Sequence, residues 1–244
     1  MKDRCMGPVR LAIPFDDFLR LPRHPAYKYE YFQGKAWLSP RPRYYHARLD
    51  LASYAPREPA SCRLRPLDDA DWPVLPPLFA AAFERQTPFC GGSDEERLEA
   101  SREALELTRA GEDGPLLRPA CLVAEDEQGR RLGALLVTLV PPGDPESWEA
   151  FRWPTPPSDE AVRNLEGKAH LTWVFVSRAV AGHGLGTALL AGAVPLLRSL
   201  GFAELFSTFL LGNESSMLWH WRQGFDLLAY PGSYRRFTRL ERLA

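Results

Sequence analysis

The sequence predicts an α/β fold, because runs typical of strands alternate along it with runs typical of helices. The clearest junction joins a strand-like run at 170–176, through the glycine-rich segment 181–187, to a leucine-rich helical pattern. With 244 residues, the chain is long enough to bury a sizeable core. Residues 1–60 are rich in Pro, Arg and aromatic residues, so we expect them to form an extension before a main domain at residues 61–244.

The extension is centred on a predicted β-hairpin. Residues 27–38 read as two short strands about Gln33–Gly34, a dipeptide typical of turns. Its aromatic residues, like Tyr44, Tyr45 and His46, are expected to cover a hydrophobic flank of the main domain rather than to bind a ligand.

The main domain is expected to begin with a strand at 63–66 and a helix that carries Leu75 and Phe79 on one face, with Pro76 and Pro77 in its first turn. A capping box at 93–96 opens a second helix, which ends at Gly111. The later elements are strands at 120–125 and 132–138, the strand 170–176, a helix through 189–200, a strand at 203–211 and a last strand at 230–238.

Residues 141–166 interrupt this pattern with many prolines and with Trp148 and Trp153. Insertions of this length are either mobile or functional. The segment is therefore interpreted either as part of the wall that holds an acceptor substrate or as a surface loop with two packed tryptophans.

The glycine-rich junction predicts a binding site for a phosphate group. Glycines allow positive φ and let several backbone N–H groups face one point, while the start of the following helix carries partial positive charge. A Walker loop is excluded, because Thr187 follows Gly186 and not a lysine. The dinucleotide pattern is excluded too, because the sixth position is Thr187 when counted from Gly182 and Leu189 when counted from Gly184.

The loop resembles the pyrophosphate loop of the GNAT N-acetyltransferases at Ala181, Gly184 and Gly186, although Ala181 replaces the usual Gln or Arg. Residues 213–225 also resemble the family's Asn-x-x-Ala-x-x-x-Tyr-x-x-x-Gly-Phe motif, with every interval kept. The resemblance covers roughly residues 62–238 and implies a mixed, mostly antiparallel sheet with flanking helices. It also implies that acetyl-coenzyme A binds as co-substrate, with its pantetheine arm between two splayed strands. The residues implied to contact it are Val174, Phe175, Val176, Ala181, Gly182, His183, Gly184, Leu185, Gly186, Thr187, Asn213 and Ser216. Asn213 can equally be the N-cap of the last helix.

Two histidines are predicted to handle protons. His220 stands where the family usually has a Tyr acid; it is either an acid for the departing sulfur or a packed structural residue. His170, which strand alternation would place on one face with Thr172, Val174 and Val176, is the candidate base, with Glu166 as the fallback and a water chain as the alternative. If both histidines act, His170 must be neutral and His220 protonated, which predicts a bell-shaped pH dependence.

These observations predict an enzyme that moves an acetyl group to a primary amine, on a small molecule or a peptide, by direct attack in a ternary complex. The alternative is a catalytically silent acyl-coenzyme A sensor or interaction module. The acceptor cannot be read from the sequence, and the oligomeric state is left open, with a homodimer as one alternative.

Composition limits the other function classes. A formal charge of −1 argues against a general nucleic-acid binder, and no apolar run is long enough to span a membrane. The first thirty residues lack the apolar region of a signal peptide, so we expect a cytoplasmic protein. The four cysteines, Cys5, Cys62, Cys90 and Cys121, are too widely spaced for a Cys-x-x-Cys metal site, and no metal is expected.

Overall fold

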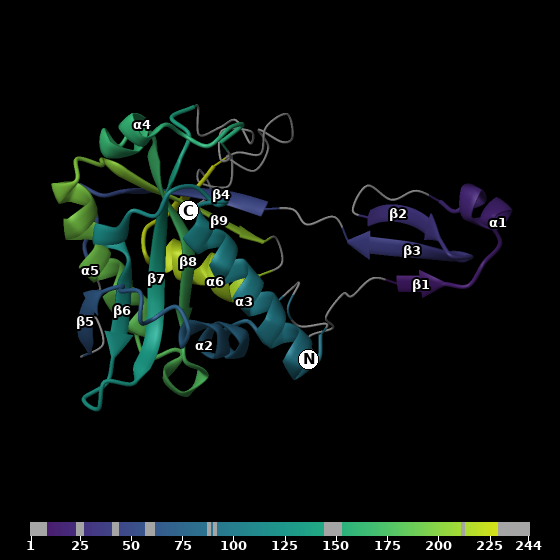
Figure 1. Cartoon of the computed structure of the whole chain (residues 1–244), viewed down its shortest axis with the longest axis horizontal. Coiled ribbons are helices and arrows are strands. Elements are labelled where there is room, and N and C mark those ends of the chain that lie inside the picture. Colours follow the sequence, from purple (N-terminus) through teal and green to yellow (C-terminus); the bar gives the residue numbers. More distant parts are fainter. Residues whose placement is uncertain are drawn as a thin grey trace, which may run out of the picture.

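The computed structural model of the chain has two sheets, which lie side by side in Figure 1. It describes residues 9–22, 27–40, 44–56, 62–86, 89, 92–143, 153–210 and 213–228. The smaller sheet has the order β1-β3-β2, with β1 at Val9–Leu11, β2 at Tyr27–Phe32 and β3 at Lys35–Pro40, and it is accompanied by helix α1 at Phe15–Arg20.

The predicted hairpin is present as β2 and β3. Its two turn residues both have positive φ, 50° at Gln33 and 72° at Gly34, a conformation that matches the right-handed twist of paired strands. The described ring contacts of Phe15, Phe18 and Tyr31 are with one another, and the Tyr31 hydroxyl donates to the carbonyl of Ile13 at 2.9 Å. Among its described contacts, Tyr31 thus packs against α1 within the small sheet and not against the main domain. Tyr45, for which the same role was expected, does pack against the main core, with its ring centroid 5.5 Å from that of Phe209.

The larger sheet has seven strands in the order β10-β4-β9-β8-β7-β6-β5. Among the described strands of this sheet, β8 and β9 pair in parallel, and the other neighbours pair antiparallel. This confirms the mixed, mostly antiparallel sheet that the resemblance implied. Its strands are β4 (Tyr44–Asp50), β5 (Arg63–Pro66), β6 (Leu122–Glu125), β7 (Arg131–Val140), β8 (Lys168–Val176), β9 (Glu204–Leu210) and β10 (Asp226–Leu227).

Strand β4 was not expected in this sheet. From the sequence, Tyr44, Tyr45 and His46 were expected to belong to the extension. In the structure β4 pairs with β9 along its whole length, from Tyr44 opposite Leu210 to Asp50 opposite Glu204. Alternation explains the fit, because Ala47 and Leu49 enter the main core while His46 turns to the other face. The expected boundary between the extension and the main domain, after residue 60, therefore separates β4 from the large sheet to which it belongs.

Helices cover both faces of the large sheet (Figure 1). Helices α2 (Leu75–Ala82) and α3 (Asp94–Ala110) pack on one face, around Phe79, Leu105 and Phe175, and we call this the α2 face. Helix α5 (Leu185–Ser199) packs on the other, the α5 face, around Leu171, Leu189 and Leu205. Helix α6 (Glu214–Arg222) also lies on the α5 face, because its Trp219 packs against that core.

Local signals account for the starts and ends of these helices. Pro76 lies in the first turn of α2, and Ser93 and Glu96 form the predicted capping box of α3. Gly111 ends α3 with φ 88°, a conformation that suits glycine. The strand expected at 230–238 lies outside the described residues.

Part of the 141–166 insertion is described, including the short helix α4 (Asp159–Arg163). The Trp153 indole N–H donates to the carbonyl of Leu139 at 2.8 Å, and the ring packs against the α5-face core. Trp153 is thus a packed tryptophan, while Trp148 lies outside the described residues. Within the described part of the chain, no helix combines the length and the apolar character that crossing a bilayer requires.

Candidate functional site

The predicted phosphate loop joins the end of β8 to the start of α5. Gly182 and Gly184 both have φ 82°, and Gly184 is the N-cap of α5. The first bond of the helix runs from the amide of Ala188 to the carbonyl of Gly184 at 2.9 Å. The amides of residues 185–187 precede that bond and therefore have no partner within the helix. Such amides, together with the helix dipole, suit the oxygens of a diphosphate.

Helix α6 braces the first turn of α5. A Cβ added at Gly186 would lie 3.2 Å from the indole nitrogen of Trp219, so a larger residue there would push the Trp219 ring away by a few tenths of an ångström. The Gln223 side-chain amide donates to the Thr187 hydroxyl at 2.9 Å, and its carbonyl oxygen accepts from the Tyr54 hydroxyl at 3.3 Å. Gln223 was missed by the sequence analysis, because a polar residue at a helix end carries no signal for this contact. Ala181 and His183 are exposed in the loop.

Strands β8 and β9 separate beside this loop. Their pairing covers only Ala169–Leu171 with Leu205–Ser207, although β8 continues to Val176 and β9 to Leu210. On its other side β8 stays paired, with Val174–Val176 opposite Gly133–Leu135. The β9-facing backbone edge of residues 173–176 is therefore outside the ladder. An extended group that carries amides can pair with such an edge as an added strand would.

An irregularity in β8 corrects the predicted side-chain alternation. Leu136 pairs with Trp173 but Val137 pairs with Leu171, so Thr172 is an extra residue in the ladder. Leu171 and Val174 consequently both contact the α5-face core, although they are three residues apart. His170 lies on the α2 face, opposite to Val174 and Val176 and not with them as expected.

His170 lies next to Leu171, the last residue of β8 that pairs with β9. Its Nδ1 lies 3.1 Å from the Thr172 hydroxyl and its Nε2 lies 2.9 Å from the Thr208 hydroxyl. Burial, followed by the nearby positive charges of His46, Lys168 and His220, lowers the pKa of His170 to about 3. The imidazole is therefore neutral at neutral pH, as a base requires, and a pKa this low also makes it a weaker base than a free imidazole.

His220 is only 2% exposed and stacks on Phe209, with ring centroids 4.4 Å apart. Its Nδ1 lies 2.8 Å from the carbonyl oxygen of Ser216, which can only accept, so Nδ1 carries the hydrogen. Its Nε2 lies 2.8 Å from the Ser207 hydroxyl. Burial lowers the pKa of His220 to about 4, although the Ser216 carbonyl opposes the shift. The burial and the stacking fit the alternative of a packed structural residue, and the lowered pKa disfavours the protonated imidazole that the acid role needs. The acid role itself stays a prediction.

The two imidazoles lie near each other but on opposite faces of the sheet. Ser207, which contacts His220, and Thr208, which contacts His170, are neighbours on β9. Both histidines thus meet the sheet where β8 and β9 separate. Glu166 is exposed in the turn before β8, where it accepts a hydrogen bond from the Asn164 side chain at 3.1 Å.

The start of α6 shows what Asn213 does. Its side-chain oxygen accepts from the backbone N–H of Ser216 at 3.0 Å, which confirms the alternative that Asn213 caps this helix. Ser216 in turn supplies the carbonyl that holds His220. A contact of Asn213 or Ser216 with a coenzyme stays a prediction.

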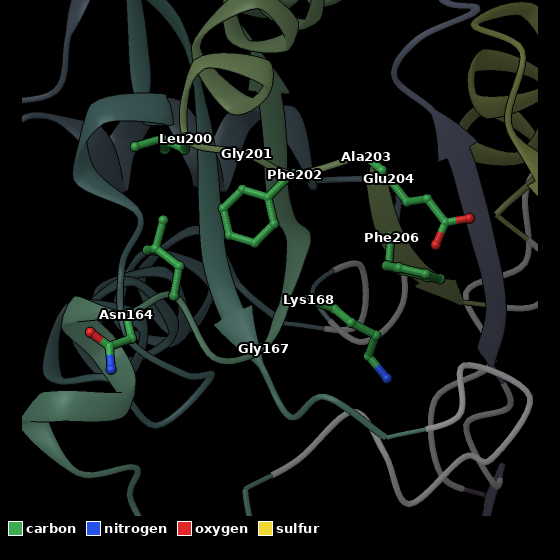
Figure 2. A pocket seen from close by; sticks show the side chains of 10 residues that line it. Asn164, Gly167, Lys168, Leu200, Gly201, Phe202, Ala203, Glu204 and Phe206 are labelled. Atoms are coloured by element: carbon green, nitrogen blue, oxygen red, sulfur yellow. The ribbon is translucent and has the colours of Figure 1, made fainter.

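A pocket of about 360 Å³ lies at the other end of β8 (Figure 2). It contains none of the predicted site residues. Its walls come from the turn before β8 and from the segment between α5 and β9, with the Phe202 and Phe206 rings, Lys168 and Glu204 among its lining residues. Nine residues of β8 separate this end from the phosphate loop. No group of three or more His, Cys, Asp or Glu residues suited to a metal ion occurs among the residues that the structure describes.

Comparisons with known proteins agree with this geometry. Residues 118–225 match the acetyltransferase (GNAT) family. The chain superposes on a GCN5-related N-acetyltransferase from Sphaerobacter thermophilus with a TM-score of 0.51 at 16% identity, covering 91% of this chain and 57% of that one. The chain thus spans little more than half of that structure.

Two further solved structures are similar at lower scores. One is the PaiA N-acetyltransferase from Thermoplasma acidophilum in complex with coenzyme A, with a TM-score of 0.48, 18% identity and coverage of 71% of this chain and 95% of that one. The other is a GNAT family acetyltransferase from Brucella melitensis in complex with acetyl-CoA, with a TM-score of 0.45, 21% identity and coverage of 71% and 91%. No curated protein matches the sequence.

Proposed function

We propose that this chain, whose residues 118–225 form a GNAT acetyltransferase domain, moves an acetyl group from acetyl-coenzyme A to a primary amine by direct attack in a ternary complex. One observation carries the proposal: the edge of β8 that leaves the ladder with β9 ends at Val176, and one loop, with a short 3-10 helix at Arg178–Val180, leads from there to the glycine-capped start of α5. The two features are adjacent, and each suits a different part of the same molecule.

Different residues are proposed to hold successive parts of the coenzyme. Amides at the start of α5 would hold the diphosphate, with Gly184 turning the backbone toward it. The edge of residues 173–176 would pair with the amides of the pantetheine arm. The arm would then point along β8 toward Leu171, where the two strands meet. Bound there, acetyl-coenzyme A supplies an activated acetyl thioester close to His170.

His170 is proposed as the group that takes the proton of the amine. A free amine with a pKa near 10.4 is almost fully protonated at neutral pH, so attack requires a base or a water chain. The same burial and the positive charge of Lys168, which lower the pKa of His170, would also lower the pKa of an ammonium group brought beside it. Proton transfer depends on the difference between the pKa of the ammonium group and the pKa of His170. Because the same surroundings lower both pKa values, this difference changes less than either value does.

The binding half of the proposal is tested by calorimetry with coenzyme A. Gly184→Ala places a side chain at φ 82°, and Gly111→Ala does the same at φ 88° at the end of α3. Both variants carry a similar strain of about 1–2 kcal/mol. Only Gly184→Ala should weaken coenzyme binding, and equal binding by the two variants and the unmodified protein would refute the placement of the diphosphate.

The catalytic half is tested by following thiol release with acetyl-coenzyme A and a panel of amines. We expect release with at least one amine, and a loss of roughly 100-fold in kcat for His170→Gln but not for Glu166→Gln. A loss confined to Glu166→Gln would point to the fallback base, and no loss in either variant would point to the water chain.

A silent acyl-coenzyme A sensor is the second candidate. It is favoured by the state of His220, which is neutral and hydrogen-bonded at both ring nitrogens and therefore supplies no acid at neutral pH. Coenzyme binding without thiol release from any amine in the panel would favour the sensor. Release with any of them would exclude it.

A further inference from the structure

We propose that His46, Thr208, Thr172 and Thr138 form a one-way hydrogen-bond chain that fixes the hydrogen of His170 on Nδ1, and that the Thr208 hydroxyl delivers the proton of the amine to Nε2. The second half rests on the proposed function, whereas the first half concerns the protein alone. None of these four residues was a candidate from the sequence.

The hydrogen-bond chain crosses four neighbouring strands, β4, β9, β8 and β7. The Nδ1 of His46 lies 3.4 Å from the Thr208 hydroxyl oxygen, which lies 2.9 Å from Nε2 of His170. The Nδ1 of His170 lies 3.1 Å from the Thr172 hydroxyl, and the Thr172 and Thr138 hydroxyl oxygens are 2.8 Å apart. All of these side chains are on the α2 face, at the point where β8 and β9 separate.

The direction of the chain is set at its last member. Thr138 is fully buried and its hydroxyl lies 2.9 Å from the backbone carbonyl of Asp113, which can only accept. The single hydroxyl hydrogen of Thr138 is thus used, so Thr138 must accept from Thr172. The other acceptor for Thr172, the carbonyl of His170, is farther away at 3.4 Å.

The tautomer of His170 follows from this direction. Because the Thr172 hydroxyl donates to Thr138, its oxygen must accept from His170, which places the imidazole hydrogen on Nδ1. A neutral imidazole has one donor and one acceptor, so Nε2 accepts from the Thr208 hydroxyl. The oxygen of Thr208 can then accept from Nδ1 of His46. The charged or titratable groups around His170 are His46, Lys168 and His220. At neutral pH the positive charge of Lys168 disfavours an imidazolium, whereas burial keeps His46 and His220 neutral.

This arrangement defines the proton transfer. The basic atom of His170, Nε2, faces a hydroxyl and not open space, so the proton of an ammonium group reaches it through Thr208. An N–H bond of the ammonium breaks as an O–H bond forms at Thr208, while the original O–H bond of Thr208 breaks and an N–H bond forms at Nε2. The products are a neutral amine and an imidazolium. Thr208 is partly exposed, as this step requires, whereas His46 is buried at 4% exposure and acts as a positioning residue.

Nitrogen NMR of protein labelled with ¹⁵N-histidine tests the first half without any substrate. His170→Gln assigns the signals. In the unmodified protein at pH 7.5 we expect the Nδ1–H tautomer of His170. Thr138→Ser should keep this tautomer, whereas Thr138→Val should show a mixture of the Nδ1–H and Nε2–H tautomers. An Nε2–H tautomer in the unmodified protein would overturn the inference, and that measurement decides even if Thr138→Val does not fold.

Steady-state kinetics of thiol release test the second half. We expect Thr208→Ser to keep kcat within about twofold and Thr208→Val to lose roughly 100-fold, with KM for acetyl-coenzyme A unchanged in both. Equal kcat in the two variants would refute the relay through Thr208. If no amine is acetylated at all, the proposed function fails, whereas the tautomer measured by NMR still decides the hydrogen-bond chain.

Discussion

Replacing His220 by phenylalanine tests whether this histidine is neutral in the folded protein. Phenylalanine keeps a flat ring against Phe209 but cannot be protonated. At pH 8 the variant loses the bonds to Ser207 and to the carbonyl of Ser216, which should cost about 1–3 kcal/mol in the free energy of unfolding. This cost does not depend on pH, because neither partner titrates.

The pH dependence has a definite sign. The pKa of His220 falls from 6.5 to about 4 on folding, so below pH 6.5 the unfolded chain binds a proton that the folded chain does not. The unmodified protein therefore loses stability as the pH falls through this window, by about 2 kcal/mol at pH 5 and about 3 kcal/mol at pH 4 from this group alone. The variant lacks this loss, so the gap between the two proteins should close as the solution is acidified.

Urea unfolding followed by tryptophan fluorescence, at intervals from pH 8 to pH 4, gives the free energy of unfolding of both proteins. His46 and His170 also make the protein less stable in acid, but they are present in both chains and cancel in the difference. A gap that stays constant from pH 8 to pH 4 would show that His220 titrates normally when folded. The acid role that the sequence suggested would then be restored.

Three further changes probe the framework. Asp71 is fully buried and accepts hydrogen bonds from Arg65 at 2.6 and 2.7 Å and from Arg131 at 3.1 Å. Asp71→Ala should therefore lower the free energy of unfolding by about 3–5 kcal/mol. A loss under about 1 kcal/mol in urea titrations would contradict this. Ser93→Ala removes the capping box of α3 and should cost about 1 kcal/mol in the same assay, with an unchanged midpoint as the contrary result. Gln223→Leu removes the hydrogen bond to the Thr187 hydroxyl, so it should weaken coenzyme A binding in calorimetry while leaving the urea midpoint nearly unchanged. A lower urea midpoint with unchanged binding would assign Gln223 to stability alone.

The secondary structure was largely predictable because its signals are local. The capping box before α3, the prolines at the start of α2 and the turn at Gln33–Gly34 act over three or four residues, and each appears where the sequence placed it. The glycine-rich loop is equally local, since positive φ at Gly182 and Gly184 is a property of the residue type.

The sequence by itself determined the α/β class, the order of the main elements from residue 63 to residue 222 apart from the short helix α4, and the position of the loop before α5. Only the tertiary structure decided that β4 enters the large sheet, that an extra residue at Thr172 turns His170 to the α2 face, and that burial leaves His220 neutral. The physical reason is distance along the chain. Strand partners, ladder registers and desolvation depend on residues far apart in the sequence, such as Tyr44 and Leu210 in β4 and β9, and no periodicity within one segment encodes them.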